Sequence, residues 1–169
     1  VLVAGLTGLV RFPGSGGKLT SEEEIRMLAS LGTKELSERG EIVFDCGGQG
    51  YNLEKLIAYF SADPEERPAY LRTIRFGQSG EPHICQVTAG KVLRIDSFDR
   101  IDSSGLYGRH EVFQATYEHI GTVDIYINIP SRLFILYNGE LPTEDELRSQ
   151  NEDRWSNVAS VPLSELGEP

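Results

Sequence analysis

The stretch from Leu71 to Phe98 constrains the fold more than any other part of this sequence. Its apolar residues recur at nearly every second position between turn signals, which is the spacing of half-buried strands in a meander. The turn signals are Gly77-Gln78-Ser79-Gly80 and Ala89-Gly90. We therefore expect an antiparallel sheet at the centre of the chain, with the other segments covering one face of it or extending its edges.

One segment shows the periodicity of a helix instead. Leu53, Leu56, Ile57 and Phe60 are spaced as on one face of an α-helix, and Asn52 stands before them at the position of an N-cap. The spacing predicts an amphipathic helix over about 52–61. Its apolar face is expected to pack on the central sheet.

Capping boxes, in which Ser or Thr is followed three residues later by Glu, predict shorter helices that begin near Ser21 and Thr143. These elements together predict an α+β fold, with an antiparallel meander of about five to seven strands, one amphipathic helix on a face and short helices near both ends. At 169 residues we expect a single α+β domain over 19–141. An N-terminal arm with a Gly-rich linker is expected over 1–18, and a C-terminal helix and tail over 142–169.

The segment between Glu111 and Ile129 is predicted to form a hairpin that turns around Gly121. Its second strand alternates cleanly, so that Ile127 and Ile129 are expected to face inward and Tyr126 outward.

The charge of the chain limits its partners. Lys and Arg number 16 against 26 Asp and Glu, which gives a formal charge of −10. Such a surface repels the phosphates of nucleic acid, so we expect no nucleic-acid partner. The longest apolar run, over 1–10, is about half of what a helix needs to cross a bilayer, so no membrane span is expected. The acidity favours a neutral or cationic partner.

The two cysteines, Cys46 and Cys85, are too few for a disulfide scaffold and too far apart in sequence for a zinc knuckle. A bond between them would close a loop of about 40 residues and contribute roughly 3–4 kcal/mol. We expect this disulfide because the apolar segment that opens the chain is also compatible with secretion. The alternative is a pair of buried thiols that behave as small apolar side chains.

Three aspartates, Asp96, Asp99 and Asp102, recur every third residue in a segment rich in Ser and Gly. Their oxygens could hold a hard cation such as calcium, although the spacing is not that of an EF-hand loop. The simpler interpretation is an ordinary turn, which Asp and Ser also favour. We expect no cofactor, with calcium at these aspartates as the alternative, and the three histidines show no zinc-ligand spacing.

Several short motifs resemble an uncharacterised family of small bacterial envelope proteins, secreted or lipid-anchored, which forms a domain of unknown function. The resemblance covers roughly residues 39–108 and is carried by Arg39-Gly40-Glu41-Ile42-Val43, Gly50-Tyr51-Asn52-Leu53-Glu54-Lys55-Leu56, Leu71-Arg72, Gly80-Glu81-Pro82 and the pair Asp96 and Asp102. The chain departs from the family in the position of its cysteines and in having Ser15 where an anchoring cysteine would stand. The resemblance implies an α+β fold and an extracytoplasmic location without a lipid anchor in this chain, and it implies no activity.

No arrangement of residues typical of an active site is present, so we expect a non-enzymatic extracytoplasmic binding or interaction module of unknown ligand, for which a protein is one candidate partner. The candidate contact residues are Tyr107, Tyr117 and Tyr126. A first alternative is a self-assembling subunit that adds its N-terminal arm as a strand to a neighbouring copy. A second alternative is a metal-dependent enzyme or calcium-stabilised module that uses the three aspartates.

Overall fold

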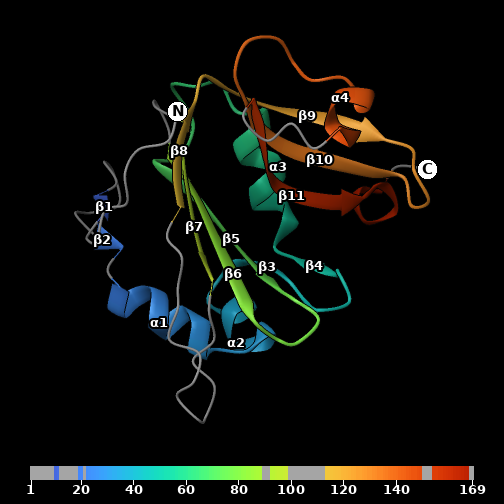
Figure 1. Cartoon of the computed structure of the whole chain (residues 1–169). Helices are drawn as coiled ribbons and strands as arrows, with labels where there is room; N and C mark the ends of the chain where they lie inside the picture. Colours follow the sequence, from blue (N-terminus) through green and yellow to red (C-terminus); the bar gives the residue numbers. More distant parts are fainter. Residues whose placement is uncertain are drawn as a thin grey trace.

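The computed structural model describes residues 10–11, 19–20, 22–88, 92–98, 113–149 and 154–167. Two main sheets pack against each other, and helices lie on both sides of the larger one (Figure 1). The shortest strands, β1 (Val10–Arg11) and β2 (Leu19–Thr20), pair with each other in the N-terminal segment.

The larger sheet has six strands in the order β4-β3-β5-β6-β7-β8. The meander predicted between Leu71 and Phe98 is confirmed, because β5, β6 and β7 pair antiparallel in chain order and β8 extends the sheet. Antiparallel neighbours with short connections are what alternating apolar residues between turns produce. The six strands are β3 (Ile42–Phe44), β4 (Gly50–Tyr51), β5 (Tyr70–Phe76), β6 (Pro82–Thr88), β7 (Val92–Phe98) and β8 (Phe113–Tyr117).

One pair of strands in this sheet is parallel. β3 runs in the same direction as β5, with Val43 opposite Ile74, so the chain must cross from one end of the sheet to the other between them. The crossover contains β4 and the helix α3 (Leu53–Ser61), which confirms the predicted helix. Its predicted apolar face is corrected at one position, because Ile57 is 40% exposed and Tyr59 is buried instead. Leu56 and Tyr59 are the buried residues of α3. They hold the helix on the sheet.

Asn52 does not cap α3 in the predicted way. It occupies the N-cap position with a left-handed backbone at φ 59°, and its side chain accepts no hydrogen bond from the helix. Instead, its amide Nδ2 donates to the carbonyl oxygens of Ser37 at 2.9 Å and Glu41 at 2.7 Å. The side chain therefore joins the start of α3 to the segment that leads into β3.

The smaller sheet has three antiparallel strands, β9 (His119–Ile125), β10 (Ser131–Tyr137) and β11 (Trp155–Pro162), with β10 in the middle. β11 corrects the prediction of a C-terminal tail. Its burial does not alternate strictly, because the register shifts at Phe134/Ile135 and leaves Val158 and Ala159 both buried. This bulge and the polar residues of the strand interrupt the alternation of apolar and polar positions by which a strand is recognised in a sequence.

The predicted hairpin around Gly121 is also wrong. Gly121 lies inside β9 and pairs with Ile135 of β10. β8 and β9 are nearly continuous and are separated only by Glu118, so the chain passes directly from the six-stranded to the three-stranded sheet. The Glu118 amide donates to Asn138 Oδ1 at 2.9 Å, and its carboxylate accepts from the amide of Gly139 at 3.1 Å.

The main core lies between the two sheets. It contains residues from both sheets and from α3, among them Val87 and Leu136, which are fully buried. A second core lies on the opposite face of the larger sheet, where α1 (Glu22–Ser30) and α2 (Thr33–Glu38) pack Leu28 and Leu36 against β3, β5 and β6. α1, which confirms the helix predicted near Ser21, and α2 therefore cover one face of the sheet, while α3 and the smaller sheet cover the other (Figure 1).

The outer face of the smaller sheet carries a third cluster. The helix α4 (Glu144–Arg148), which confirms the predicted capping box at Thr143 and Glu146, packs Leu147 against Leu133 and Ile135. A short 3-10 helix, η1 (Leu163–Leu166), follows β11 and adds Leu163 to the buried residues.

Candidate functional site

The structure describes two of the three predicted contact tyrosines, and their exposure differs. Tyr126 is 66% exposed, so it is available for contact. Tyr117 is 6% exposed and belongs to the core between the sheets, which corrects its assignment to a binding surface. Tyr117 is the last residue of β8, and it packs in the same core as residues of the smaller sheet. Tyr107 lies outside the described residues.

The predicted disulfide is not formed. Cys46 follows the end of β3 and is exposed, whereas Cys85 is buried on β6. β5 lies between these two strands, and neighbouring strands are about 4.8 Å apart, so the backbones are separated by roughly 10 Å. This exceeds the span of about 4.4–6.8 Å between Cα atoms that a disulfide bridges.

The predicted cation site cannot be built from the described part of the chain. Asp96 lies on β7, of which the backbone is described, and Asp99 and Asp102 lie outside the described residues. Within the described ranges, no group of three or more His, Cys, Asp or Glu side chains is placed to hold a metal ion.

The loop between β9 and β10, residues 126–130, presents apolar side chains to solvent. Tyr126 and Ile129 are 66% and 64% exposed, and Ile127 is 38% exposed. The inward orientation predicted for Ile127 and Ile129 is therefore wrong. β9 ends at Ile125, and Asn128 then adopts φ 50°, which turns the chain and ends the alternation.

This β9–β10 loop is held in place by three hydrogen bonds. The Tyr126 amide donates to Glu144 Oε1 of α4 at 3.1 Å, the Leu163 amide donates to the Pro130 carbonyl at 2.9 Å, and Ser131 Oγ donates to the Ile129 carbonyl at 3.0 Å. The apolar side chains thus stand on a backbone that is fixed from α4 and η1.

Two ion pairs lie beside the loop. The Arg148 guanidinium, and then the Tyr126 amide, hold the pKa of Glu144 below its usual value, so this carboxylate stays charged where it supports the loop. Next to the loop, Arg132 of β10 makes two hydrogen bonds to its cross-strand neighbour Asp124 of β9, at 2.7 and 2.9 Å, and lowers the pKa of that carboxyl.

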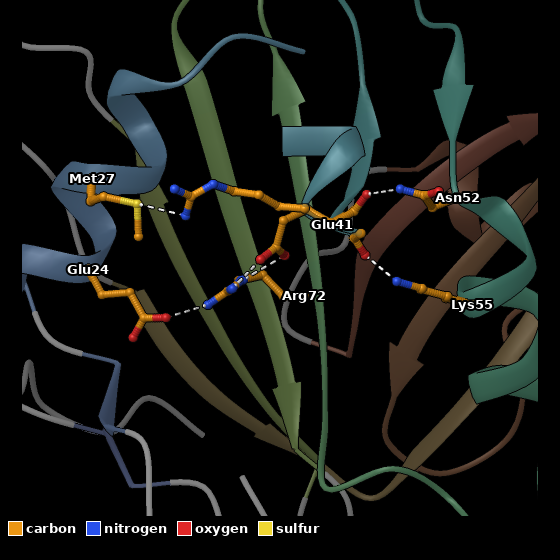
Figure 2. Close-up of polar contacts among 8 residues, drawn as sticks. Glu24, Met27, Glu41, Asn52, Lys55 and Arg72 are labelled. Carbon is orange, nitrogen blue, oxygen red and sulfur yellow. Dashed lines mark hydrogen bonds and ion pairs between the residues drawn. The ribbon is translucent and has the colours of Figure 1, made fainter. Parts of the chain in front are cut away.

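A second cluster of charged residues joins α1, the start of β3, and β5. Arg72 of β5 donates two hydrogen bonds to the Glu41 carboxylate and one, at 3.1 Å, to Glu24 of α1 (Figure 2). The Arg72 side chain is 9% exposed, and those of Glu41 and Glu24 are 15% and 22% exposed. Burial by itself lowers the pKa of Arg72, but the hydrogen bonds and charge of Glu41, together with the hydrogen bond to Glu24, outweigh it and raise that pKa. We call these three residues the Arg72 network.

A cavity of about 400 Å³ lies beside the Arg72 network. It opens between the segment before β3, α3 and the start of β5, and its walls include Arg39, Lys55 and Tyr70. Lys55 Nζ donates to the carbonyl of Gly40 at 2.5 Å, and Arg39 Nη1 lies 3.5 Å from the sulfur of Met27 (Figure 2).

Nothing in the sequence pattern indicated the Arg72 network or the cavity. The three charged residues stand 17 and 31 positions apart, and each is unremarkable in its own segment. The sequence feature related to the cavity is the pair Arg39-Gly40 before a short strand, followed by Lys55 on the polar side of a helix. This feature becomes informative only when the parallel pairing of β3 and β5 is known.

Comparisons with known proteins give no match for this chain. No protein-family model matches it, and neither a curated protein nor a solved structure shows significant similarity. Among the helices that the structure describes, none combines the length and apolar character needed to cross a membrane.

Proposed function

We propose that this chain is a non-enzymatic binding module that contacts another protein through the β9–β10 loop. The supporting observation is the exposure of Tyr126, Ile127 and Ile129 on a loop whose backbone is tied to α4 and η1. Exposed apolar side chains that cluster at one place are typical of interaction sites, and tyrosine is frequent among the residues that dominate binding energy.

The fixed backbone supports the proposal further. Ordering a loop on binding costs free energy, and a loop that is already held in place avoids much of that cost. The partner should offer an apolar pocket for Tyr126 and Ile129. Its surroundings should be neutral or cationic, because this chain carries a formal charge of −10. An extracytoplasmic location is part of the proposal and rests on the family resemblance alone.

Site-specific photo-crosslinking in the native host tests the proposal. A photoreactive phenylalanine analogue replaces Tyr126 in one variant and Ile57 in another, because Ile57 is also exposed, at 40%, but lies on α3. We expect one discrete adduct from position 126 and none from position 57. The adduct should be lost when Ile129→Ser is added. Equal labelling at both positions, or no adduct at 126, would contradict the proposal.

Size-exclusion chromatography separates this function from self-assembly. The alternative subunit would lose its assembly when residues 1–17 are deleted, whereas a module that binds a different protein stays monomeric with or without them. In the structure, Val10–Arg11 of this arm pairs with Leu19–Thr20 of the same chain.

A further inference from the structure

The cavity beside the Arg72 network carries an inference that does not depend on the β9–β10 loop. Its volume of about 400 Å³ lies within the range of roughly 300–1,000 Å³ that small-molecule sites occupy. It is formed where three segments meet, and the walls are contributed by residues far apart in sequence, among them Arg39, Lys55 and Arg72.

The charges in the walls are unbalanced in favour of cations. Arg39, Lys55 and Arg72 line the cavity together with one acidic residue, Glu41. Arg72 is paired with two carboxylates, those of Glu41 and Glu24, so the excess of positive charge comes from Arg39 and Lys55. Within the described residues, the Lys55 ammonium contacts a backbone carbonyl and the Arg39 guanidinium contacts a thioether, and neither contacts a carboxylate. This local excess of positive charge stands out in a chain with a formal charge of −10.

Lys55 is fixed at the rim of the cavity by a specific feature of the backbone. Gly40 adopts φ +83°, and a Cβ at this position would lie 2.6 Å from Lys55 Nζ. The glycine therefore leaves the space into which the ammonium fits. One of the three ammonium hydrogens is donated to the Gly40 carbonyl, so the ammonium keeps donor capacity for a further acceptor.

The remaining walls are largely apolar. Ile42 and Leu71 come from the two parallel strands, Ala58 from α3, and Pro68 and Tyr70 from the approach to β5. A hydrated inorganic ion gains nothing from such walls, whereas an apolar or aromatic body is stabilised by leaving water.

We propose that this cavity binds a small organic acid. Its carboxylate accepts a charge-assisted hydrogen bond from Lys55, and its apolar body lies against Pro68 and Tyr70. Arg72 is held by Glu41 and Glu24 and acts as a fixed wall, so it does not compete with Lys55 for the ligand.

Titrations followed by amide chemical shifts in NMR test this proposal with four probes. Benzoate combines an acid with an aromatic body, benzyl alcohol lacks the charge, benzylamine reverses it, and inorganic phosphate lacks the apolar body. We expect benzoate to shift the amides of 40–42, 55–59 and 70–72, and the other three probes to leave them nearly unchanged. Binding of benzyl alcohol with equal strength, or of phosphate in place of benzoate, would overturn the assignment, as would the absence of any binding.

Variants of Lys55 locate the contact. Loss of a hydrogen bond between charged groups is worth about 1.5 kcal/mol at the lower end, so Lys55→Gln should weaken benzoate binding about tenfold, and Lys55→Arg should restore most of it. Lys34→Gln is the matched control, because it removes one positive charge from an exposed position on α2 outside the cavity. Lys55 is exposed, so the fold should survive, and a circular dichroism spectrum checks this. Equal weakening in the Lys34 and Lys55 variants would overturn the proposal.

Discussion

Replacing Glu41 by Gln is expected to destabilise the chain more than the loss of any exposed ion pair. Glu41→Gln conserves size but removes the charge that compensates Arg72, and it turns an amide donor toward guanidinium donors. Because the Arg72 side chain is 9% exposed, its charge is then poorly solvated. Breaking a buried pair by removing one partner costs about 3–5 kcal/mol, and the remaining contact with Glu24 places our expectation near 3 kcal/mol.

Two further variants make this expectation quantitative. Glu24→Gln removes the charge of the more exposed of the two carboxylates that bond Arg72 and should cost roughly 1.5 kcal/mol. Glu38→Gln is the control, since Glu38 and Lys34 form an exposed pair at 3.8 Å whose loss should cost less than about 0.5 kcal/mol. The ranking of the three losses of unfolding free energy therefore tests whether the cost of removing a carboxylate rises with the burial of its ion pair.

Urea denaturation followed by circular dichroism measures these free energies of unfolding, provided that the m-value stays constant. The double variant Glu41→Gln/Arg72→Gln should lose less than the sum of its single variants, by about 1–3 kcal/mol, because each single variant leaves the other group unpaired. The reasoning is refuted if Glu41→Gln is as mild as Glu38→Gln, or if the double variant is simply additive.

Three further predictions concern buried or tightly bonded groups. Burial raises the pKa of Tyr59 to about 12, against a smaller opposing effect of Arg67, and its hydroxyl has no hydrogen-bond partner among the described residues. The free energy of unfolding should therefore fall between about pH 10 and 12. Tyr59→Phe should be neutral or stabilising by about 1 kcal/mol and should reduce that fall in urea titrations. Ellman's reagent should label Cys46 rapidly in the native protein and Cys85 only on unfolding, and quick labelling of both would contradict their burial. Asn52→Asp should cost roughly 2–3 kcal/mol in thermal or urea unfolding, because a carboxylate cannot donate to the two carbonyls that the amide contacts, whereas a loss below about 0.5 kcal/mol would show that these bonds contribute little.

The elements that could be predicted are those whose signal is local. The alternation between Leu71 and Phe98 and the helical spacing after Asn52 each lie within one segment, and both were confirmed. β11 could not be recognised, because a bulge in its pairing with β10 shifts which residues are buried. The parallel pairing of β3 and β5 is likewise a long-range property that no short window contains.

The same distinction applies to the candidate sites. Ile127 and Ile129 continue the alternation of β9 without a break, so their exposure contradicts the local pattern; only Asn128 and Pro130 signalled that the strand had ended. The Arg72 network depends on the meeting of α1, β3 and β5, and a charged residue in each of these segments reads as ordinary surface until the segments are placed together.

Glu118 is the only residue between β8 and β9, and this short connection affects how the two sheets open. A single residue offers only its own φ and ψ to a hinge motion, and its backbone amide and carboxylate are both held by the segment after β10. We therefore expect the two sheets to open together. Amide hydrogens at the centres of β5 and β10 should accordingly exchange with deuterium at a common, slowest rate, set by global unfolding of the whole molecule.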